Sequence, residues 1–138
     1  MVRFTHPRLD DVPLAGVLHA LAEPVRLAIV KRLEMDRAAG GSGLPCGVGA
    51  GSGIAPATAS NHYAVLRSAG LVHARKEGVQ VIHELRRSEI DQRFPGLLDA
   101  VLLAASNSPR VARANSAIAA SKVSHSSTGL MPACKSGT

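Results

Sequence analysis

Aromatic residues are nearly absent from this chain of 138 residues. They make up 2% of it, as Phe4, Tyr63 and Phe94, and there is no tryptophan. A hydrophobic core must therefore be built from Leu, Val, Ile and Ala, which favours packed helices over a β-sandwich. The length suits one small domain, and the hydrophobic fraction of 46% is ordinary for a globular protein.

Cysteines and long apolar runs are also scarce. The two cysteines, Cys46 and Cys134, are too few for a disulfide framework. Residues 1–11 contain no apolar run that could act as a signal peptide, and the apolar run at 101–105 is far too short to cross a bilayer. We therefore expect a cytoplasmic protein without a membrane partner.

Acidic residues are missing from the C-terminal part of the chain. The net charge is +6, yet residues 101–138 hold four basic residues and no acidic one. Positive charge is therefore weak support for nucleic-acid binding, because much of it lies near the C-terminus. Residues 106–138 include eight serines. We predict a domain over residues 1–105 and a basic, Ser/Ala-rich, largely disordered tail over 106–138.

Apolar spacing predicts two helices before residue 40. The first has a stripe at i, i+3, i+4 and i+7, with Asp11 as the expected N-cap, formed by Leu14, Val17, Leu18 and Leu21. The second is expected to begin at Glu23 and Pro24. Its apolar residues cover most of its surface, which is typical of a central helix.

Residues 40–53 are unusually rich in glycine. Seven of these fourteen residues are glycine, and each glycine inside an exposed helix costs about 1 kcal/mol relative to alanine. Any helix in this stretch is therefore predicted to be short or held by packing alone.

A third long helix is predicted from Pro56, ending at Gly70 in a left-handed conformation. Helical spacing predicts that Ala59, Tyr63 and Leu66 face the core. Alternating residues at 79–85 then predict a β-hairpin with its tip near Glu77 and Gly78. In that hairpin, His73 and His83 are expected to face each other.

Two further helical segments are predicted near residues 88–105. Ser88 and Asp91 have the spacing of a capping box, Pro95 interrupts the helix, and residues 96–105 continue as an apolar helix. The fold class predicted is mainly α with a β-hairpin: a winged helix-turn-helix of order α-α-(short α or turn)-α-β-β-α. In such a fold, a helix enters the major groove of DNA and the hairpin offers basic side chains to phosphates.

Two segments resemble the ArsR/SmtB type of winged-helix repressors. "LHALAEPVRLAIVKRL" (residues 18–33) is similar to that family's Leu-(Ser/Ala)-(Asp/Glu)-Pro-x-Arg-Leu signature, and "ATASNHYAVLRSAGLVHARKEGVQVIHEL" (residues 57–85) is similar to its recognition helix and wing. The resemblance covers residues 6–105. It implies a homodimer, formed by the first and last helices, that represses transcription by binding a palindromic operator in double-stranded DNA.

The candidate site residues follow from these patterns. Those expected to contact DNA are Thr58, Ser60, Asn61, His62, Arg67, Arg75 and Lys76. Those expected at the dimer interface are Leu14, Val17, Leu18, Leu97, Leu98, Val101 and Leu102. Asn61 is the main candidate for reading a base, because an amide can pair with the adenine edge. His62 is equally compatible with the core, and Arg26 is interpreted as structural.

Other site chemistry is weakly supported. The six histidines are scattered and cannot be assembled into a metal site, so no metal or cofactor is expected. Cys46 is a possible redox-sensitive thiol, although an inert thiol is the simpler interpretation. No nucleophile set or phosphate-binding loop indicates an enzyme.

A second interpretation remains open. Ala55 stands where a polar helix cap is usual, and the turn before it is rich in glycine. Both features are compatible with a winged-helix dimerisation or protein-interaction module that reads DNA weakly or not at all. The effector is unknown under either interpretation.

Overall fold

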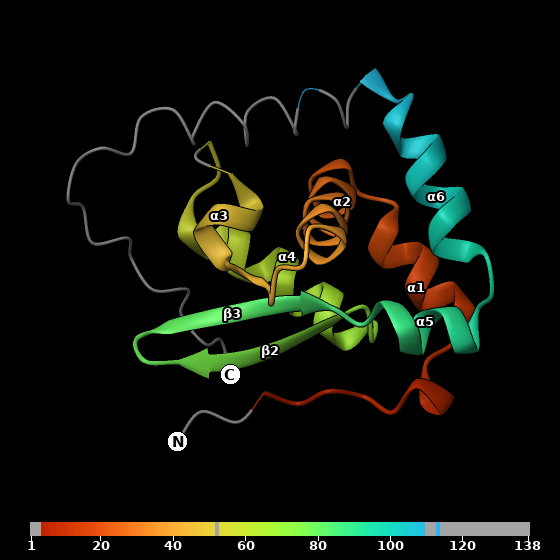
Figure 1. The fold of residues 1–138 in the computed structure, drawn as a ribbon, viewed down its shortest axis with the longest axis horizontal. Coiled ribbons are helices and arrows are strands. Elements are labelled where there is room, and N and C mark those ends of the chain that lie inside the picture. The colour runs from red at the N-terminus through yellow and green to blue at the C-terminus, as the bar shows by residue number, and fades with distance from the viewer. Residues whose placement is uncertain (1–3, 52, 110–112, 114–138) are drawn as a thin grey trace.

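The computed structural model describes residues 4–51, 53–109 and 113 (Figure 1). The elements follow in the order η1 (Leu9–Asp11), α1 (Leu14–Leu21), α2 (Pro24–Ala38), β1 (Leu44–Pro45), α3 (Cys46–Ala50), α4 (Pro56–Ser68), β2 (Val72–Glu77), β3 (Gln80–Leu85), α5 (Arg87–Arg93) and α6 (Leu97–Ser106). Helices therefore dominate, and the predicted winged helix-turn-helix is confirmed. The predicted tail at 106–138 lies almost wholly outside the described residues.

The sheet has three antiparallel strands in the order β1-β3-β2. The hairpin of β2 and β3 pairs Val72 with Leu85 and Glu77 with Gln80, so Gly78 and Val79 form its tip. The two-residue strand β1 pairs with the other edge of β3. The strand β1 was not predicted, because a strand of two residues is too short to show an alternating pattern in the sequence.

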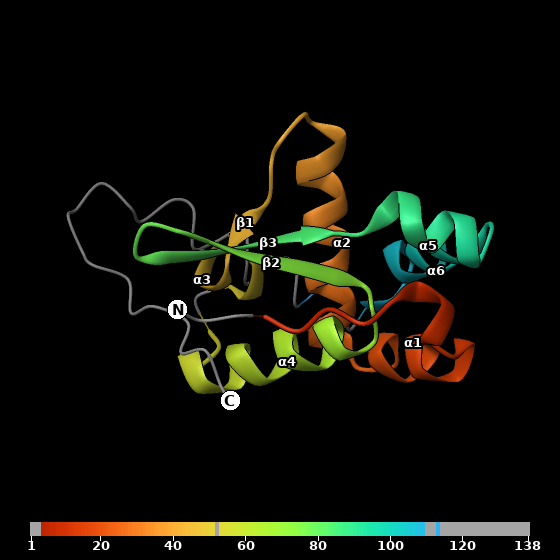
Figure 2. The same ribbon diagram turned by 90° about the horizontal axis from the view of Figure 1, so that it is seen from below.

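The core lies between α2, α4 and the sheet. Its largest fully buried side chains include Tyr63, Ile29, Leu33, Leu66 and Leu71. The central helix α2 contacts α1, α3, α4, α6 and β3, as its apolar surface predicted (Figures 1 and 2). No helix in the described part of the chain is both long and apolar enough to cross a membrane.

Several predicted local signals are confirmed. The Glu23 carboxylate accepts a hydrogen bond from the Arg26 backbone N–H at 2.9 Å, and Pro24 is the first residue of α2. The Arg26 side chain donates to the carbonyl of Ala20 at 2.7 Å, which ties it to the end of α1. Gly70 has φ +77°, the left-handed conformation expected after α4.

Two predicted caps are wrong. Asp11 ends the short helix η1, and the N-cap of α1 is Pro13, without a side-chain hydrogen bond. The Ser88–Asp91 capping box does not form, because the N-cap of α5 is Arg86, two residues before Ser88, and the helix begins at Arg87. The Asp91 carboxylate instead accepts a hydrogen bond from the Arg87 side chain at 2.7 Å.

The predicted pairing of His73 with His83 is also wrong. In the hairpin register His73 faces Glu84, and His83 faces Ala74. The strands therefore put the two imidazoles one residue out of register. Since successive side chains on a strand point to opposite faces, His83 is buried and His73 is exposed.

Candidate nucleic-acid interface

The helix α4 has one buried and one exposed face. Ala59, Tyr63 and Leu66 on the inner face are 2%, 0% and 0% exposed, as predicted. Thr58 and Asn61 are exposed on the outer face. Figure 2 shows α4 along one border of the molecule, with α2 and the sheet on its inner side. The first half of α4 can therefore present polar side chains outward while its inner face stays anchored.

The short helix α3 and the turn after it deliver α4 to this position. Gly51 has φ +90°, a conformation that residues with a side chain rarely adopt, and it ends α3. A Cβ atom added at Gly49 would overlap the Tyr63 hydroxyl. Geometry therefore requires glycine at both positions: Gly51 turns the chain, and Gly49 makes room for Tyr63, the only tyrosine in the sequence.

Behind α4, Tyr63 and His83 join the helix to the wing. Their rings stack with centroids 3.9 Å apart and an interplanar angle of 26°, and His83 is 1% exposed. Burial lowers the pKa of His83 to about 3, assisted by the nearby Arg67 guanidinium and opposed by a hydrogen bond with the Leu44 backbone. The neutral imidazole therefore belongs to the core and helps to set the position of β3 against α4.

The polar residues of α4 differ in their accessibility. Ser60 is half-buried and Asn61 is exposed. The side chain of His62 is only 17% exposed, and its Nδ1 lies 3.7 Å from a carboxylate oxygen of Glu23 at the start of α2. His62 thus sits at the boundary between the core and the outer face, as its position in the pattern suggested.

Arg67 lies on a different side of α4. Its guanidinium lies over the ring of Phe4, 5.1 Å from the centroid, and burial lowers its pKa. This contact ties Arg67 to the segment that precedes η1. The sequence showed no sign of the contact, because the two residues are far apart in the chain and neither belongs to a motif.

The two basic residues predicted in the wing are not equivalent. The Arg75 guanidinium donates to Glu77 at 3.0 Å, to Glu84 at 3.1 Å and to the Ser42 carbonyl at 2.5 Å. Lys76 is exposed. Arg75 would have to exchange these partners in order to bind a phosphate, whereas Lys76 is accessible on the surface of the wing.

The predicted dimer residues also divide into two groups. Val17 and Leu98 are fully buried within the protomer. Leu97, Val101 and Leu102 are partly buried against the core. Leu14 and Leu18 on α1 are 46% and 45% exposed. Leu103 on α6 lies in the same apolar run but was not among the predicted residues, and it is 71% exposed.

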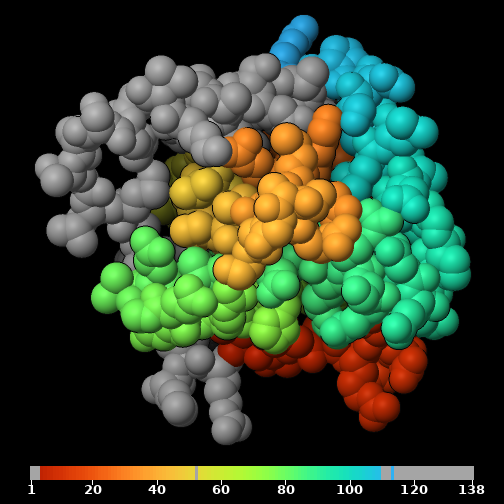
Figure 3. All heavy atoms as spheres, in the orientation of Figure 1, coloured from red at the N-terminus to blue at the C-terminus, as the bar shows by residue number. Residues whose placement is uncertain are grey.

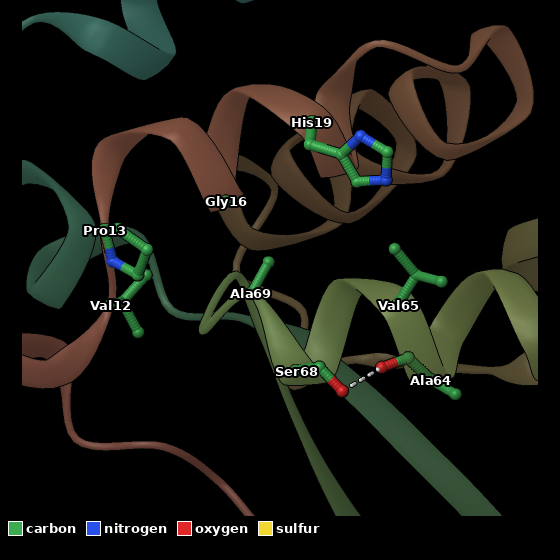
Figure 4. Close-up of a pocket in the computed structure, with 8 residues that line it drawn as sticks. All are labelled: Val12, Pro13, Gly16, His19, Ala64, Val65, Ser68 and Ala69. Atoms are coloured by element: carbon green, nitrogen blue, oxygen red, sulfur yellow. Dashed lines mark hydrogen bonds between the residues drawn. The ribbon is translucent and has the colours of Figure 1, made fainter.

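A groove of about 450 Å³ lies between α1 and the C-terminal half of α4 (Figure 4). Small and apolar side chains line most of it, including Gly16, Val65 and Ala69. The Ser68 hydroxyl donates to the Ala64 carbonyl within α4 at 2.9 Å, so its own helix satisfies it. The helix α1 therefore lies beside the predicted recognition helix α4, across this groove.

The remaining site chemistry concerns Cys46 and the metal-ligating side chains. Cys46 is 6% exposed at the start of α3, and no cysteine among the described residues is free. Within the described ranges, no three His, Cys, Asp or Glu side chains are grouped closely enough to hold a metal ion.

Comparison with known proteins agrees with this geometry. No protein-family model matches the chain. The chain is 35% identical over 96 residues to the uncharacterised HTH-type transcriptional regulator YceK of Bacillus subtilis (strain 168). The alignment covers 69% of this chain and 92% of that relative. On this relationship and its fold, the chain belongs to the HTH-type, or helix-turn-helix, transcriptional regulators.

Proposed function

We propose that this protein is a sequence-specific DNA-binding regulator of the ArsR/SmtB type. The observation that carries the proposal is the anchored helix α4, whose outer face exposes Thr58 and Asn61 beside a two-stranded wing. A helix held in this way can enter the major groove, where each base pair presents a distinct pattern of donors and acceptors.

Each polar residue has a chemically defined role in this proposal. The Asn61 amide can donate to N7 and accept from the N6 amine of adenine, a contact that discriminates bases by about 1–3 kcal/mol. The hydroxyls of Thr58 and Ser60 can bind either a base or a phosphate. Lys76 in the wing contacts the backbone, which adds affinity without adding sequence information.

The contacts of the arginines change their expected roles. We assign Arg75 mainly to stabilising the wing, because its guanidinium has three partners there. We assign Arg67 to holding Phe4 rather than to binding DNA. His62 is a secondary contact, since its side chain is largely covered.

The regulator is proposed to act as a homodimeric repressor that binds an inverted repeat. Exposed leucines on α1 and α6 support a dimer, since apolar side chains that a monomer leaves in water gain from burial against a partner. The domain that carries both activities is proposed to span residues 1–105, with residues 106–138 as an appended basic tail.

A second function is favoured by a specific observation. The N-cap of α4 is Ala55, which makes no side-chain hydrogen bond, and the first turn contains only Pro56 and Ala57 before Thr58. A reading helix with so few polar groups at its start fits a winged-helix dimerisation or protein-interaction module with weak DNA binding.

Selection from a random pool of duplex DNA separates the two functions. The purified chain would be mixed with the pool at moderate salt, and bound DNA would be amplified and sequenced over several rounds. We expect an inverted repeat to be enriched, and binding to the enriched duplex to weaken as salt rises because counterions are released from phosphates. A dimer that enriches no sequence would favour the interaction module.

A further inference from the structure

The segment before η1 is docked along the wing. Residues 4–8, here called the arm, run beside the outer edge of β2, as the red band below the green strands shows in Figure 3. The backbone N–H of Ala74 in β2 donates a hydrogen bond to Nε2 of His6 at 2.9 Å. Among the described strands β2 forms this edge of the sheet, and a side chain of the arm takes the place that a fourth strand would occupy there.

Other contacts hold the arm in place. The imidazoles of His6 and His73 stack with centroids 4.1 Å apart and an interplanar angle of 18°. The Arg86 side chain donates to the Pro7 carbonyl at 3.0 Å. Phe4 lies under the Arg67 guanidinium, as described above. These contacts connect the arm to β2, to the start of α5 and to α4.

The central hydrogen bond requires a neutral His6. Nε2 can accept from the Ala74 N–H only through its lone pair, and a protonated imidazole has a donor on both ring nitrogens. Protonation would therefore place an N–H donor of His6 opposite the N–H donor of Ala74, and this hydrogen bond could not form. It would also add a positive charge beside His73, Arg86 and Arg67, which face His6 from three elements.

The electrostatic surroundings act in the same direction. Burial lowers the pKa of His6 first, followed by His73, Arg86 and Arg67, while Glu89 on α5 raises it. Burial and three neighbouring side chains thus oppose the charged form of His6, and Glu89 favours it. The docked arm selects the neutral imidazole by geometry and by charge.

We propose that the arm is a proton-sensitive clasp on the wing, docked while His6 is neutral and released when His6 takes up a proton. Release exposes the edge of β2 and removes Phe4 from Arg67. The wing strand that carries Arg75 and Lys76 then loses its outer support, and Arg67 on α4 becomes accessible to solvent. Mild acid would in this way alter the surface that the proposed function assigns to DNA.

The direction of the pH dependence follows from linkage. The docked state lowers the pKa of His6, so it binds fewer protons than the released state. The docked state has its full stability when the pH is above the pKa of a free histidine, about 6.5. The docked state loses stability as the pH falls below that value. If His6 stays neutral while docked, lowering the pH from 7.5 to 5.5 increases the released population about tenfold.

Amide hydrogen exchange measured by NMR on the full chain tests the clasp. We expect the protection factor of the Ala74 amide, corrected for intrinsic exchange, to fall between pH 7.5 and 5.5, by up to about tenfold. The amide of Leu66, near the C-terminal end of α4, should change much less. An unchanged Ala74 protection factor, or an equal fall at Leu66, would overturn the proposal, since the second result means that the whole fold responds.

Two variants sharpen the test. His6→Gln keeps an acceptor, the amide oxygen, but cannot be protonated, so Ala74 should stay protected at pH 5.5. His19→Gln changes an exposed histidine on α1 and should behave as the wild type does. A pH response that survives in His6→Gln would contradict the clasp. None of these measurements uses DNA, so their outcome is independent of the proposed function.

Discussion

At the residue scale, the contact between Gly49 and Tyr63 explains an unusual feature of the sequence. Glycine is unfavourable inside a helix, yet Gly49 lies in α3 and is buried. The Tyr63 hydroxyl occupies the space that a Cβ atom would need. That hydroxyl has no hydrogen-bond partner among the described residues, so Gly49 and Tyr63 fit together by shape and not through a hydrogen bond.

Gly49→Ala should therefore destabilise the protein although alanine is the better helix former. We expect a loss of about 1–3 kcal/mol in the free energy of unfolding, since an added methyl group forces a packed neighbour to move. Urea unfolding followed by circular dichroism measures this change. Gly53→Ala is the matched control, because an added Cβ there meets nothing within 4 Å.

A double-mutant cycle identifies the neighbour. Tyr63→Phe removes the hydroxyl and should itself cost little, because the hydroxyl has no partner to lose. In the Tyr63→Phe background, Gly49→Ala should lower the free energy of unfolding by less than it does in the wild type. An equal cost in both backgrounds would show that the strain has another source.

At the element scale, Arg87 links three helices. Its guanidinium pairs with Asp91 on α5 at 2.7 Å, with Glu34 on α2 at 3.2 Å, and with Asp99 on α6. The pKa of Arg87 is raised, chiefly by its hydrogen bonds with Asp91 and Asp99. Its side chain is only 12% exposed and that of Glu34 is 19% exposed, whereas Asp91 and Asp99 are 38% and 74% exposed. Removing Arg87 therefore takes a partner away chiefly from the poorly solvated Glu34 carboxylate.

Arg87→Met should lower the free energy of unfolding by about 1–3 kcal/mol. Arg37→Met is a matched control, because Arg37 pairs with the same Glu34 carboxylate at 2.8 Å but its side chain is 43% exposed. Exposed ion pairs contribute about 0–1 kcal/mol, so Arg37→Met should be nearly neutral. Thermal unfolding of both variants provides the comparison, and equal losses would contradict the linking role of Arg87.

Much of the element pattern was predictable, because it depends on local spacing. Apolar periodicity located α1, α2 and α4, and alternation located the hairpin. The predicted caps at Asp11 and Ser88 are wrong because α1 and α5 begin at Leu14 and Arg87, directly after the N-caps Pro13 and Arg86. Asp91 instead accepts a hydrogen bond from the charged Arg87 side chain.

The candidate site was predictable only in part. The inward face of α4 follows from helical spacing, and Ala59, Tyr63 and Leu66 are buried as predicted. The engagement of Arg75 with Ser42 and of Arg67 with Phe4 could not be predicted, because such contacts depend on long-range packing. Long-range packing also decided that Val17 and Leu98 belong to the protomer core.

At the scale of the whole molecule, two surfaces lie at opposite ends. The tip of the wing lies at one end in Figures 1 and 2, while α1, α5 and α6 gather at the other. Exposed leucines occur at the second end, on α1 and α6. A dimer formed there would leave the wing and the outer face of α4 available to DNA.

Leu18→Glu should break the proposed dimer without unfolding the protomer. Leu18 is 45% exposed, so a carboxylate there is solvated in the monomer but would be buried in the dimer. Size-exclusion chromatography with light scattering should show a dimer for the wild type and a monomer for this variant. Met35→Glu, at an exposed apolar position on α2, should remain dimeric. A monomeric wild type would contradict the proposed homodimer, and with it the reason to expect an inverted repeat as the binding site.

The central claim is that α4 reads bases while the wing contacts phosphates. Fluorescence anisotropy of Asn61→Ala and Lys76→Ala, on the selected duplex and on a random duplex, tests it most directly. Gln92→Ala, an exposed amide on α5, is the control. We predict that Asn61→Ala weakens binding to the selected duplex by about 1–3 kcal/mol with little change on random DNA, whereas Lys76→Ala weakens both alike. Equal losses for Asn61→Ala on the two duplexes would contradict the account.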